Sequence, residues 1–329
     1  MSKYKVVMLR TMFPDNKIEK DVLKEIDAEL VIAPDTDEDT AIKYVTDADA
    51  IIMPTNVNER VLEAAKKCKI VAGTGVGYDN VDVVAAGKRG IYVSNMPAQH
   101  WCADEVSNHA ISLGFAVQRK LASLNETTKG GAWREKLKDV APIFAFREQT
   151  WGLYACGHIA LAVARKVQAF GFKVIAYDPI VSEEEAYQYG IKLVDIDTLL
   201  KTSDIISIHA PLLKSTFHAF SEAEFKKMKK SASLINVGRG PIVDQKALYN
   251  ALKAGDIAAA GLDVLEDEPP KPDDPLLTLD NKILTVTPHM ASYSETSFAK
   301  SRKGSCEQVV KVLKGGVPSN WVNKKEMGK

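Results

Sequence analysis

Short apolar runs alternate with polar, helix-compatible stretches along nearly the whole chain. Between the runs lie segments such as "NKIEKDVLKEID" and "NERVLEAAKKC". Continuous apolar strands separated by helices are typical of a parallel sheet covered on both faces. The pattern therefore predicts a first α/β sheet whose strands are the Val- and Ile-rich runs at 5–10, 28–34, 48–53, 69–75 and 91–95.

A second series of elements follows. Residues 103–131 predict one long helix, opened by acids and closed by glycines, as the helix dipole and the C-cap prefer. Six strand candidates then lie between residues 150 and 288, the number that a full dinucleotide-binding domain uses. They read "TWGLYA", "KVIAYD", "IISIHAP", "ASLINVG", "AAAGLDV" and "KILTVTP".

The chain closes with a helical stretch, "ETSFAKSRKGSCEQVVKVLKGG", and an extended "VPSNWVN". Because the second sheet is already complete, we expect this tail to pack on the first domain. The sequence thus predicts an α/β protein with two doubly wound parallel-sheet domains, the second a Rossmann NAD-binding domain inserted in the first. The expected boundaries are 1–99 with 293–329 for the first domain and 100–292 for the second.

Composition narrows the classes of partner. The chain has 43 Lys and Arg against 43 Asp and Glu, and zero net charge argues against a nucleic-acid or anionic-membrane surface. It lacks a signal-peptide core and a membrane-length apolar run, so we expect a cytoplasmic protein with small-molecule partners. The cysteines form no CxxC pair, which indicates free thiols and no metal site at Cys68, Cys102, Cys156 and Cys306.

The stretch 150–179 reads as a strand, a tight turn, a helix and a second strand ending in an acid. Its turn departs from G-x-G-x-x-G: Gly157 keeps the middle position, Ala160 is small enough for the third, and Ala155 replaces the first glycine. A Cβ at Ala155 is costly if its φ is positive, or else the turn is pushed outward. The alternative is a plain βα turn.

Asp178 favours the cofactor interpretation. It lies 21 residues after Gly157, at a strand end, where a carboxylate accepts hydrogen bonds from ribose hydroxyls. Such an acid is also a common turn residue. It would repel a 2′-phosphate, and Pro179 and Ile180 offer no cation to neutralise one, so NAD is favoured over NADP.

Polar side chains follow three later strands. Arg239 stands in "LINVGRGPIVD", Asp263 and Glu268 in "AAGLDVLEDEPP", and His289 in "TVTPHMAS". Taken singly, Arg239 has an alternative as a surface cation in a turn, Glu268 as part of a solvated acidic cluster, and His289 as a helix-cap or turn residue. Ligands of open parallel sheets bind at the carboxyl ends of strands, so jointly they supply a cation for an acid substrate, an imidazole and an orienting carboxylate.

The chain resembles the D-isomer-specific 2-hydroxyacid dehydrogenases over nearly its whole length. The resemblance is carried by motifs in family order, and "CADEVSNHAISL" is most similar to the subgroup that includes the C-terminal binding protein corepressors. These motifs are "TGVGYDNVDVVAAGKRGIYVSNMP", the AxGxxA turn with "YDP", "SIHAPL", "INVGRG", "GLDVLEDEP" and "TPH".

The resemblance implies roles for individual residues. Arg239 would bind the substrate carboxylate and carbonyl oxygen, Glu268 would hydrogen-bond His289, and His289 would donate and accept the proton. The N–H groups of Val76 and Gly77 would share the substrate carboxylate. The expected cofactor-binding residues are Asp263, which would hold the nicotinamide carboxamide, with Thr74, Gly157, His158, Ile159, Asp178, Ala210, Val237 and Gly238. The family also implies a homodimer formed through the 103–131 region.

The expected function is therefore hydride transfer between NAD(H) and a 2-hydroxy acid/2-oxo acid pair, D-specific by resemblance. The alternative is an NAD-sensing scaffold of the corepressor type with little turnover. The substrate stays open among glyoxylate, hydroxypyruvate, pyruvate and bulkier 2-oxo acids. Also open are whether His100 and Trp101 reach the substrate pocket, and whether Trp151 and Tyr154, which replace small aliphatics, weaken cofactor binding.

Overall fold

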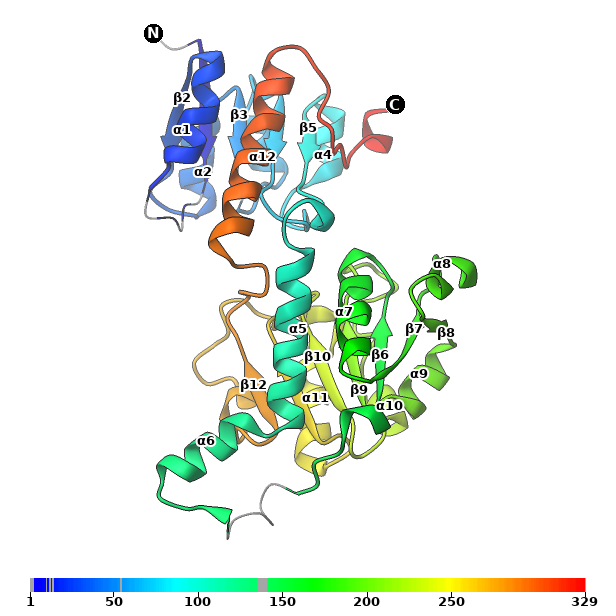
Figure 1. Ribbon diagram of the computed structural model, residues 1–329. Helices are drawn as coiled ribbons and strands as arrows, with labels where there is room; N and C mark the ends of the chain where they lie inside the picture. The colour runs from blue at the N-terminus through cyan, green and yellow to red at the C-terminus, as the bar shows by residue number, and fades with distance from the viewer. Residues whose placement is uncertain are drawn as a thin grey trace. The chain divides into compact units, whose positions relative to one another are not determined.

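The computed structural model describes residues 3–9, 11, 13, 15–53, 55–134 and 141–328. The chain divides into two compact units (Figure 1). Unit 1 comprises Met1–Trp101 with Ser294–Lys329, and unit 2 comprises Cys102–Tyr293. The sequence analysis placed the two boundaries after residues 99 and 292.

Unit 1 is built on a five-stranded parallel sheet in the order β2-β1-β3-β4-β5. Its strands are β1 (Tyr4–Met8), β2 (Ala28–Ile32), β3 (Ala50–Ile52), β4 (Ile70–Ala72) and β5 (Tyr92–Ser94). Its helices are α1 (Lys17–Leu23), α2 (Glu38–Val45), α3 (Glu59–Ala64), α4 (Val83–Lys88) and α12 (Glu295–Leu313), with short 3-10 turns η1 (Lys24–Ile26), η2 (Ala98–His100) and η7 (Lys325–Met327).

The alternating side chains of β1 separate two cores in unit 1. Val7 packs with apolar residues of α2, α3 and α4, whereas Val6 and Met8 pack with Cys306 and Val309 of α12. Successive side chains of a strand point to opposite faces, so helices cover both faces of this sheet. The tail of the protein, through α12, thus packs on the sheet of unit 1.

Unit 2 contains a seven-stranded parallel sheet in the order β12-β11-β10-β9-β6-β7-β8. Six strands match the predicted ones, and β8 is a short addition at one edge. The strands are β6 (Thr150–Tyr154), β7 (Lys173–Tyr177), β8 (Lys192–Leu193), β9 (Ile205–Ile208), β10 (Ser233–Asn236), β11 (Ala259–Leu262) and β12 (Leu284–Val286). From β6 the strands are added in one direction to β7 and β8, and from β9 in the opposite direction to β12. The carboxyl ends of β6 and β9 are therefore the switch point where such sheets bind ligands.

Helices pack on both faces of this second sheet. Residues of α9, α10 and α11 form one core with β9, β10 and β11, and α5 contacts β10, β11 and α7. The helices of unit 2 are α5 (Ala103–Gln118), α6 (Leu121–Lys129), α7 (His158–Ala169), α8 (Glu183–Tyr187), α9 (Ile196–Thr202), α10 (Glu222–Lys227) and α11 (Gln245–Ala254), with 3-10 turns η4 (Phe146–Glu148), η5 (Gly240–Ile242) and η6 (Pro275–Thr278).

The single helix predicted over 103–131 is wrong: the segment forms two helices, α5 and α6. Lys120 adopts a left-handed conformation with φ 55°, which ends α5 and redirects the chain. Just before it, the buried Gln118 side chain donates to Ser233 Oγ at 3.2 Å and so fixes the end of α5 on the sheet.

Trp151 explains why α5 carries a glycine in its middle. A Cβ at Gly114 would lie 2.5 Å from the Trp151 ring, so only glycine leaves room for the indole. The indole N–H donates to Ser207 Oγ at 2.8 Å. The large side chain at this strand position is therefore accommodated by packing between α5 and the sheet.

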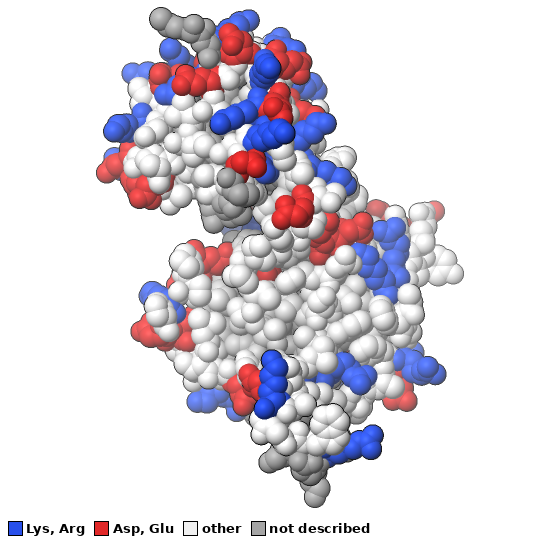
Figure 2. All heavy atoms as spheres, turned by 60° about the vertical axis from the view of Figure 1, so that its left-hand side comes forward, with Lys and Arg blue, Asp and Glu red and all other residues white. Residues whose placement is uncertain are grey.

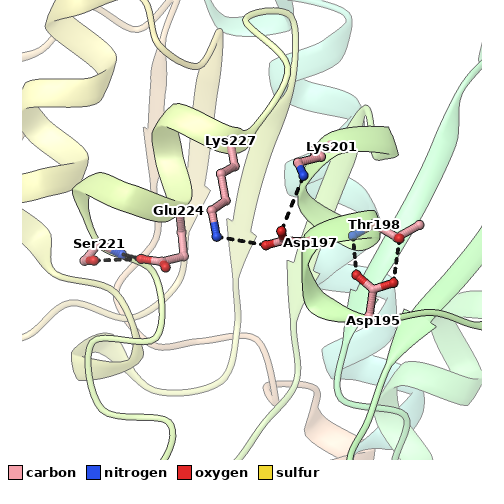
Figure 3. A network of polar contacts seen from close by, with 7 residues as sticks. All are labelled: Asp195, Asp197, Thr198, Lys201, Ser221, Glu224 and Lys227. Carbon is pink, nitrogen blue, oxygen red and sulfur yellow. Dashed lines mark hydrogen bonds and ion pairs between the residues drawn. The ribbon is translucent and has the colours of Figure 1, made fainter.

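Charged side chains also connect neighbouring helices on the surface of unit 2 (Figure 3). Asp195 caps α9 by accepting from the N–H of Thr198, and Asp197 accepts from Lys201 and from Lys227 of α10. These two ammonium groups hold the pKa of Asp197 below its ordinary value. Exposed pairs of this kind contribute little to stability individually, because solvent screens them.

Positive and negative side chains are interspersed over the face shown in Figure 2, in keeping with the zero net charge. Among the described residues, none of the helices combines the length and apolar character that crossing a membrane requires.

Candidate active site

Three predicted side chains gather at the carboxyl edge of the unit 2 sheet. Arg239 follows β10, Glu268 lies beyond β11 and His289 follows β12. His289 Nδ1 lies 2.6 Å from Glu268 Oε2, and Glu268 Oε1 accepts from the N–H of Leu265 at 3.1 Å. An ionised carboxylate can only accept, so the Nδ1 of His289 carries the proton of this contact.

The electrostatics of this pair suit proton transfer. Burial raises the pKa of Glu268, but the hydrogen bond and charge of His289, the Leu265 N–H and the nearby Arg239 outweigh it and hold the pKa below 4.5. Glu268 is therefore ionised at neutral pH and accepts the hydrogen bond of the His289 Nδ1–H. The side chains of His289 and Glu268 are 46% and 37% exposed, so the pair is open to a ligand.

His289 is held in an unusual backbone conformation. Its φ is 55°, in the left-handed region that residues other than glycine rarely occupy. Its N–H donates to the carbonyl of Asp263 at 2.8 Å. Strained residues persist where the surroundings over-determine them, and they cluster at functional sites.

Asp263 is engaged within the protein. Its carboxylate is buried and accepts from Thr287 Oγ1 at 2.6 Å and from the N–H groups of Met290 and Ala291 at 2.9 and 2.8 Å. Burial raises the pKa of Asp263, but His109, whose Nε2 lies 3.4 Å from Oδ1, and the hydrogen bonds from Thr287, Met290 and Ala291 outweigh burial and lower the pKa below 3.8. Asp263 thus organises the loop around His289, and its expected contact with a nicotinamide carboxamide stays a prediction.

The turn between β6 and α7 has the geometry of a phosphate-binding turn. Ala155 adopts φ 78°, the conformation that glycine usually supplies there. A Cβ at Gly157 would meet no described atom within 4 Å, so the backbone at the start of α7 lies open. Open N–H groups at a helix N-terminus favour a phosphate, and this turn therefore fits a dinucleotide.

Asp178 is fixed beside that turn at the end of β7. It accepts from the N–H groups of Cys156, Ile180 and Val181 at 2.8, 2.8 and 3.1 Å. A carboxylate has about four lone-pair sites, so an acceptor position is left for a ribose hydroxyl. The arrangement fits NAD at the place that the sequence indicated.

The other predicted cofactor residues of unit 2 lie at the same edge. His158 and Ile159 begin α7, Ala210 follows β9, and Val237 and Gly238 follow β10. The sequence analysis missed His209, although it quoted the motif "SIHAPL". Burial lowers the pKa of His209 to about 3, so it is neutral, and its buried Nδ1 has no hydrogen-bond partner among the described residues.

Thr74, Val76 and Gly77 lie in a loop of unit 1, after β4. The carbonyls of this loop are tied down: Ser301 of α12 donates to Thr74, Met96 N–H to Gly75 and Asn95 Nδ2 to Val76. The N–H groups of Val76 and Gly77 donate to no described residue. A rigid loop with two open donors can bind a carboxylate.

Trp101 has a packing role in unit 1. It is buried, its indole N–H donates to the carbonyl of Met96 at 2.9 Å, and its ring lies against Phe298. His100 is exposed at the end of η2. The structure thus gives Trp101 a place in the core, whereas the His100 side chain has no hydrogen-bond partner among the described residues.

The parallel sheet with helices on both faces, the open turn with its acid and the imidazole–carboxylate pair define a dinucleotide-dependent oxidoreductase. Residues 111–291 match the family model "D-isomer specific 2-hydroxyacid dehydrogenase, NAD binding domain". The chain belongs to this family of NAD-dependent enzymes, which confirms the recognition, the fold class and the cofactor expected from the sequence.

Relatives and solved structures agree with this assignment. The chain is 39% identical to a glyoxylate reductase of Korarchaeum cryptofilum, over 86% of this chain and 85% of the relative. It is also 39% identical to a D-3-phosphoglycerate dehydrogenase of Archaeoglobus fulgidus, over 92% of this chain but only 56% of that protein's length. A D-lactate dehydrogenase of Aquifex aeolicus, solved with NAD and lactic acid, superimposes with a TM-score of 0.83 at 26% identity, covering 97% and 99% of the two chains.

Proposed function

We propose that this chain reduces a small 2-oxo acid to the D-2-hydroxy acid with NADH, and catalyses the reverse reaction. The observation that carries the proposal is the contact between His289 and Glu268 at the sheet edge where Arg239 also lies. When bound, NADH supplies the hydride for C2 of the 2-oxo acid. The protein's own residues then have to manage the negative charge that develops on the carbonyl oxygen.

Each residue of the trio has one task in this chemistry. The guanidinium of Arg239 binds the substrate carboxylate and stabilises the developing oxyanion. Protonated His289 donates a proton to that oxygen, so the product leaves as a neutral alcohol. Glu268 orients the imidazole by accepting the hydrogen bond from its Nδ1–H. In the oxidative direction, neutral His289 accepts the same proton.

The cofactor assignment follows the same edge of the sheet. The turn at Gly157 receives the pyrophosphate and Asp178 the adenosine ribose, which makes NAD the preferred dinucleotide. Val76 and Gly77 offer N–H groups to the substrate carboxylate. Thr74, His158, Ile159, Ala210, Val237 and Gly238 line the cofactor, and the Asp263 region contacts the nicotinamide.

Glyoxylate and hydroxypyruvate are the substrates that we favour. Relatives that this chain spans almost fully are named glyoxylate reductase, in Korarchaeum cryptofilum and Thermococcus litoralis, and hydroxypyruvate reductase, in Thermotoga maritima. The phosphoglycerate dehydrogenase of Archaeoglobus fulgidus is considerably longer than this chain. The names of these relatives favour an enzyme over the scaffold alternative.

We also propose that the protein is a homodimer through the 103–131 region and acts in the cytoplasm. Leu121 and Leu124 of α6 are 53% and 36% exposed, which is unusual for two leucines of one helix face and supports a contact there. The four cysteines are free and buried, which fits a reducing compartment.

The test is a spectrophotometric assay of NADH oxidation with a panel of glyoxylate, hydroxypyruvate, pyruvate, a bulkier 2-oxo acid and 3-phosphohydroxypyruvate. We expect turnover to be fastest with the first two and slower with NADPH in place of NADH. Absence of turnover with every member, together with tight NADH binding, would support the scaffold instead. Fastest turnover with the phosphorylated substrate would overturn the substrate assignment but leave the reaction class intact.

A further inference from the structure

A chain of hydrogen bonds leads from α5 to the loop that carries His289. His109 Nε2 lies 2.8 Å from Thr287 Oγ1, and Thr287 Oγ1 lies 2.6 Å from Asp263 Oδ1. The Asp263 carboxylate in turn accepts from the N–H groups of Met290 and Ala291. All five residues belong to unit 2.

The direction of each hydrogen bond follows from proton counting. Asp263 is ionised, because its pKa is lowered, and it can only accept. The single hydroxyl proton of Thr287 therefore goes to Asp263, and the Thr287 oxygen accepts from His109. This requires His109 Nε2 to carry a proton, so the imidazole is the donor that completes this hydrogen-bond chain.

This chain of hydrogen bonds fixes the loop on both sides of His289. Thr287 precedes His289 by two residues and Met290 follows it directly, and both are bound by the same carboxylate. The N–H of His289 donates to the main-chain carbonyl of Asp263. Since the left-handed φ of His289 is unfavourable by itself, these contacts are what hold its ring in place against Glu268.

We propose that His109 is a positioning residue for the proton donor His289. It acts through Thr287 and Asp263, and it fixes the ring orientation in which His289 meets Glu268. This inference rests on the proposed function, because it assumes that His289 handles the proton.

The fold of unit 2 does not depend on the His109 contact. Helix α5 is also held by Lys166, which donates to Ser107 Oγ and Asn108 Oδ1 at 2.7 and 2.8 Å, and by its packing on β10 and β11. The His109 side chain is 25% exposed, so its replacement leaves no closed cavity. A change at this position should thus act on turnover and leave folding nearly intact.

The test compares His109→Leu, which removes the donor, with His109→Gln, whose amide nitrogen can replace Nε2. Ser112→Ala is the control, because Ser112 is an exposed residue of the same helix that binds only the carbonyl of Asn108 among the described residues. We expect His109→Leu to lower kcat about 10- to 100-fold, since small displacements of a catalytic group cost this much. The KM for the 2-oxo acid and the Kd for NADH should change less than about 2-fold, because Arg239 and the Gly157 turn are untouched.

The conservative variant distinguishes positioning from general damage. His109→Gln should retain most of the turnover, and Thr287→Val, which interrupts the chain one step further, should reproduce the loss. Equal losses in His109→Leu and His109→Gln, or wild-type turnover in His109→Leu, would overturn the inference. If His289→Ala itself keeps turnover, the proposed function fails; if His289→Ala is inactive and His109→Leu is not, only the inference fails.

Discussion

At the scale of single residues, Ala155 shows how the cofactor turn tolerates the loss of its first glycine. Its φ of 78° means that the turn keeps the glycine conformation instead of moving outward. For a residue other than glycine, the left-handed conformation costs about 1 to 2 kcal/mol. Alanine loses less backbone entropy on folding than glycine does, and this difference recovers about 0.5 to 1 kcal/mol. The entropy term offsets about half of the strain, so the cofactor turn accommodates alanine at a small net cost.

We therefore expect Ala155→Gly to change the free energy of unfolding by less than about 1 kcal/mol. Ala155→Val should lower it by more, because a β-branched side chain is strained at positive φ. Urea denaturation of the two variants beside the wild type measures the difference. A valine variant as stable as the wild type would show that the turn relaxes easily.

The proposed role of Asp178, at the end of β7 beside that turn, is to select the dinucleotide. Asp178→Ala should weaken NADH binding and narrow the preference over NADPH, because it removes a ribose acceptor and a repulsive charge together. Asp178→Asn keeps an acceptor without the charge, so it should lose less NADH affinity. Fluorescence titration with both nucleotides reports the result, and a wild type that binds NADPH as well as NADH would contradict this role.

At the scale of elements, the loop after β12 depends on an ionised Asp263. Its folded pKa is lowered, so its contribution to stability is full above the unfolded value of 3.8 and is lost as the pH falls through the folded pKa. The Asp263→Asn protein should be about 1.5 to 3 kcal/mol less stable to unfolding at neutral pH. The asparagine NH2 group is a donor, so it cannot accept from the loop N–H groups as the carboxylate does. The difference in the free energy of unfolding between this variant and the wild type should shrink below pH 3.8.

Thermal unfolding across this pH range tests the loop, with Asp267→Asn of the neighbouring exposed segment as control. A gap between Asp263→Asn and the wild type that is the same at neutral and acid pH would contradict an ionised Asp263. So would an equal loss of stability in the control.

The elements also show what the sequence could and could not predict. Strands and the trio of Arg239, Glu268 and His289 were predictable, because apolar periodicity and strand-end position are local signals. The break at Lys120 was not, since nothing in a helix-compatible stretch announces a left-handed lysine that the packing of α5 imposes. The link from His109 to Thr287 joins residues 178 positions apart, and no local pattern reports such a contact.

At the scale of the whole molecule, the proposed homodimer places the exposed leucines of α6 in an interface. Leu121→Arg should shift the protein toward the monomer, because it would bury an unpaired charge. Val84→Arg is the matched control: Val84 is 50% exposed on α4 of unit 1, outside the proposed interface. Light scattering coupled to size exclusion measures the mass, and a dimer that persists in Leu121→Arg would place the interface elsewhere.

The central claim is that His289 donates the proton during NADH-dependent reduction of a 2-oxo acid. The most direct measurement is kcat for NADH oxidation with glyoxylate in wild type and His289→Ala, with the NADH Kd determined for both. We predict that kcat falls about 100- to 10,000-fold, the usual contribution of a general acid, while the Kd stays within about 2-fold. A His289→Ala enzyme that turns over at close to the wild-type rate would contradict the account.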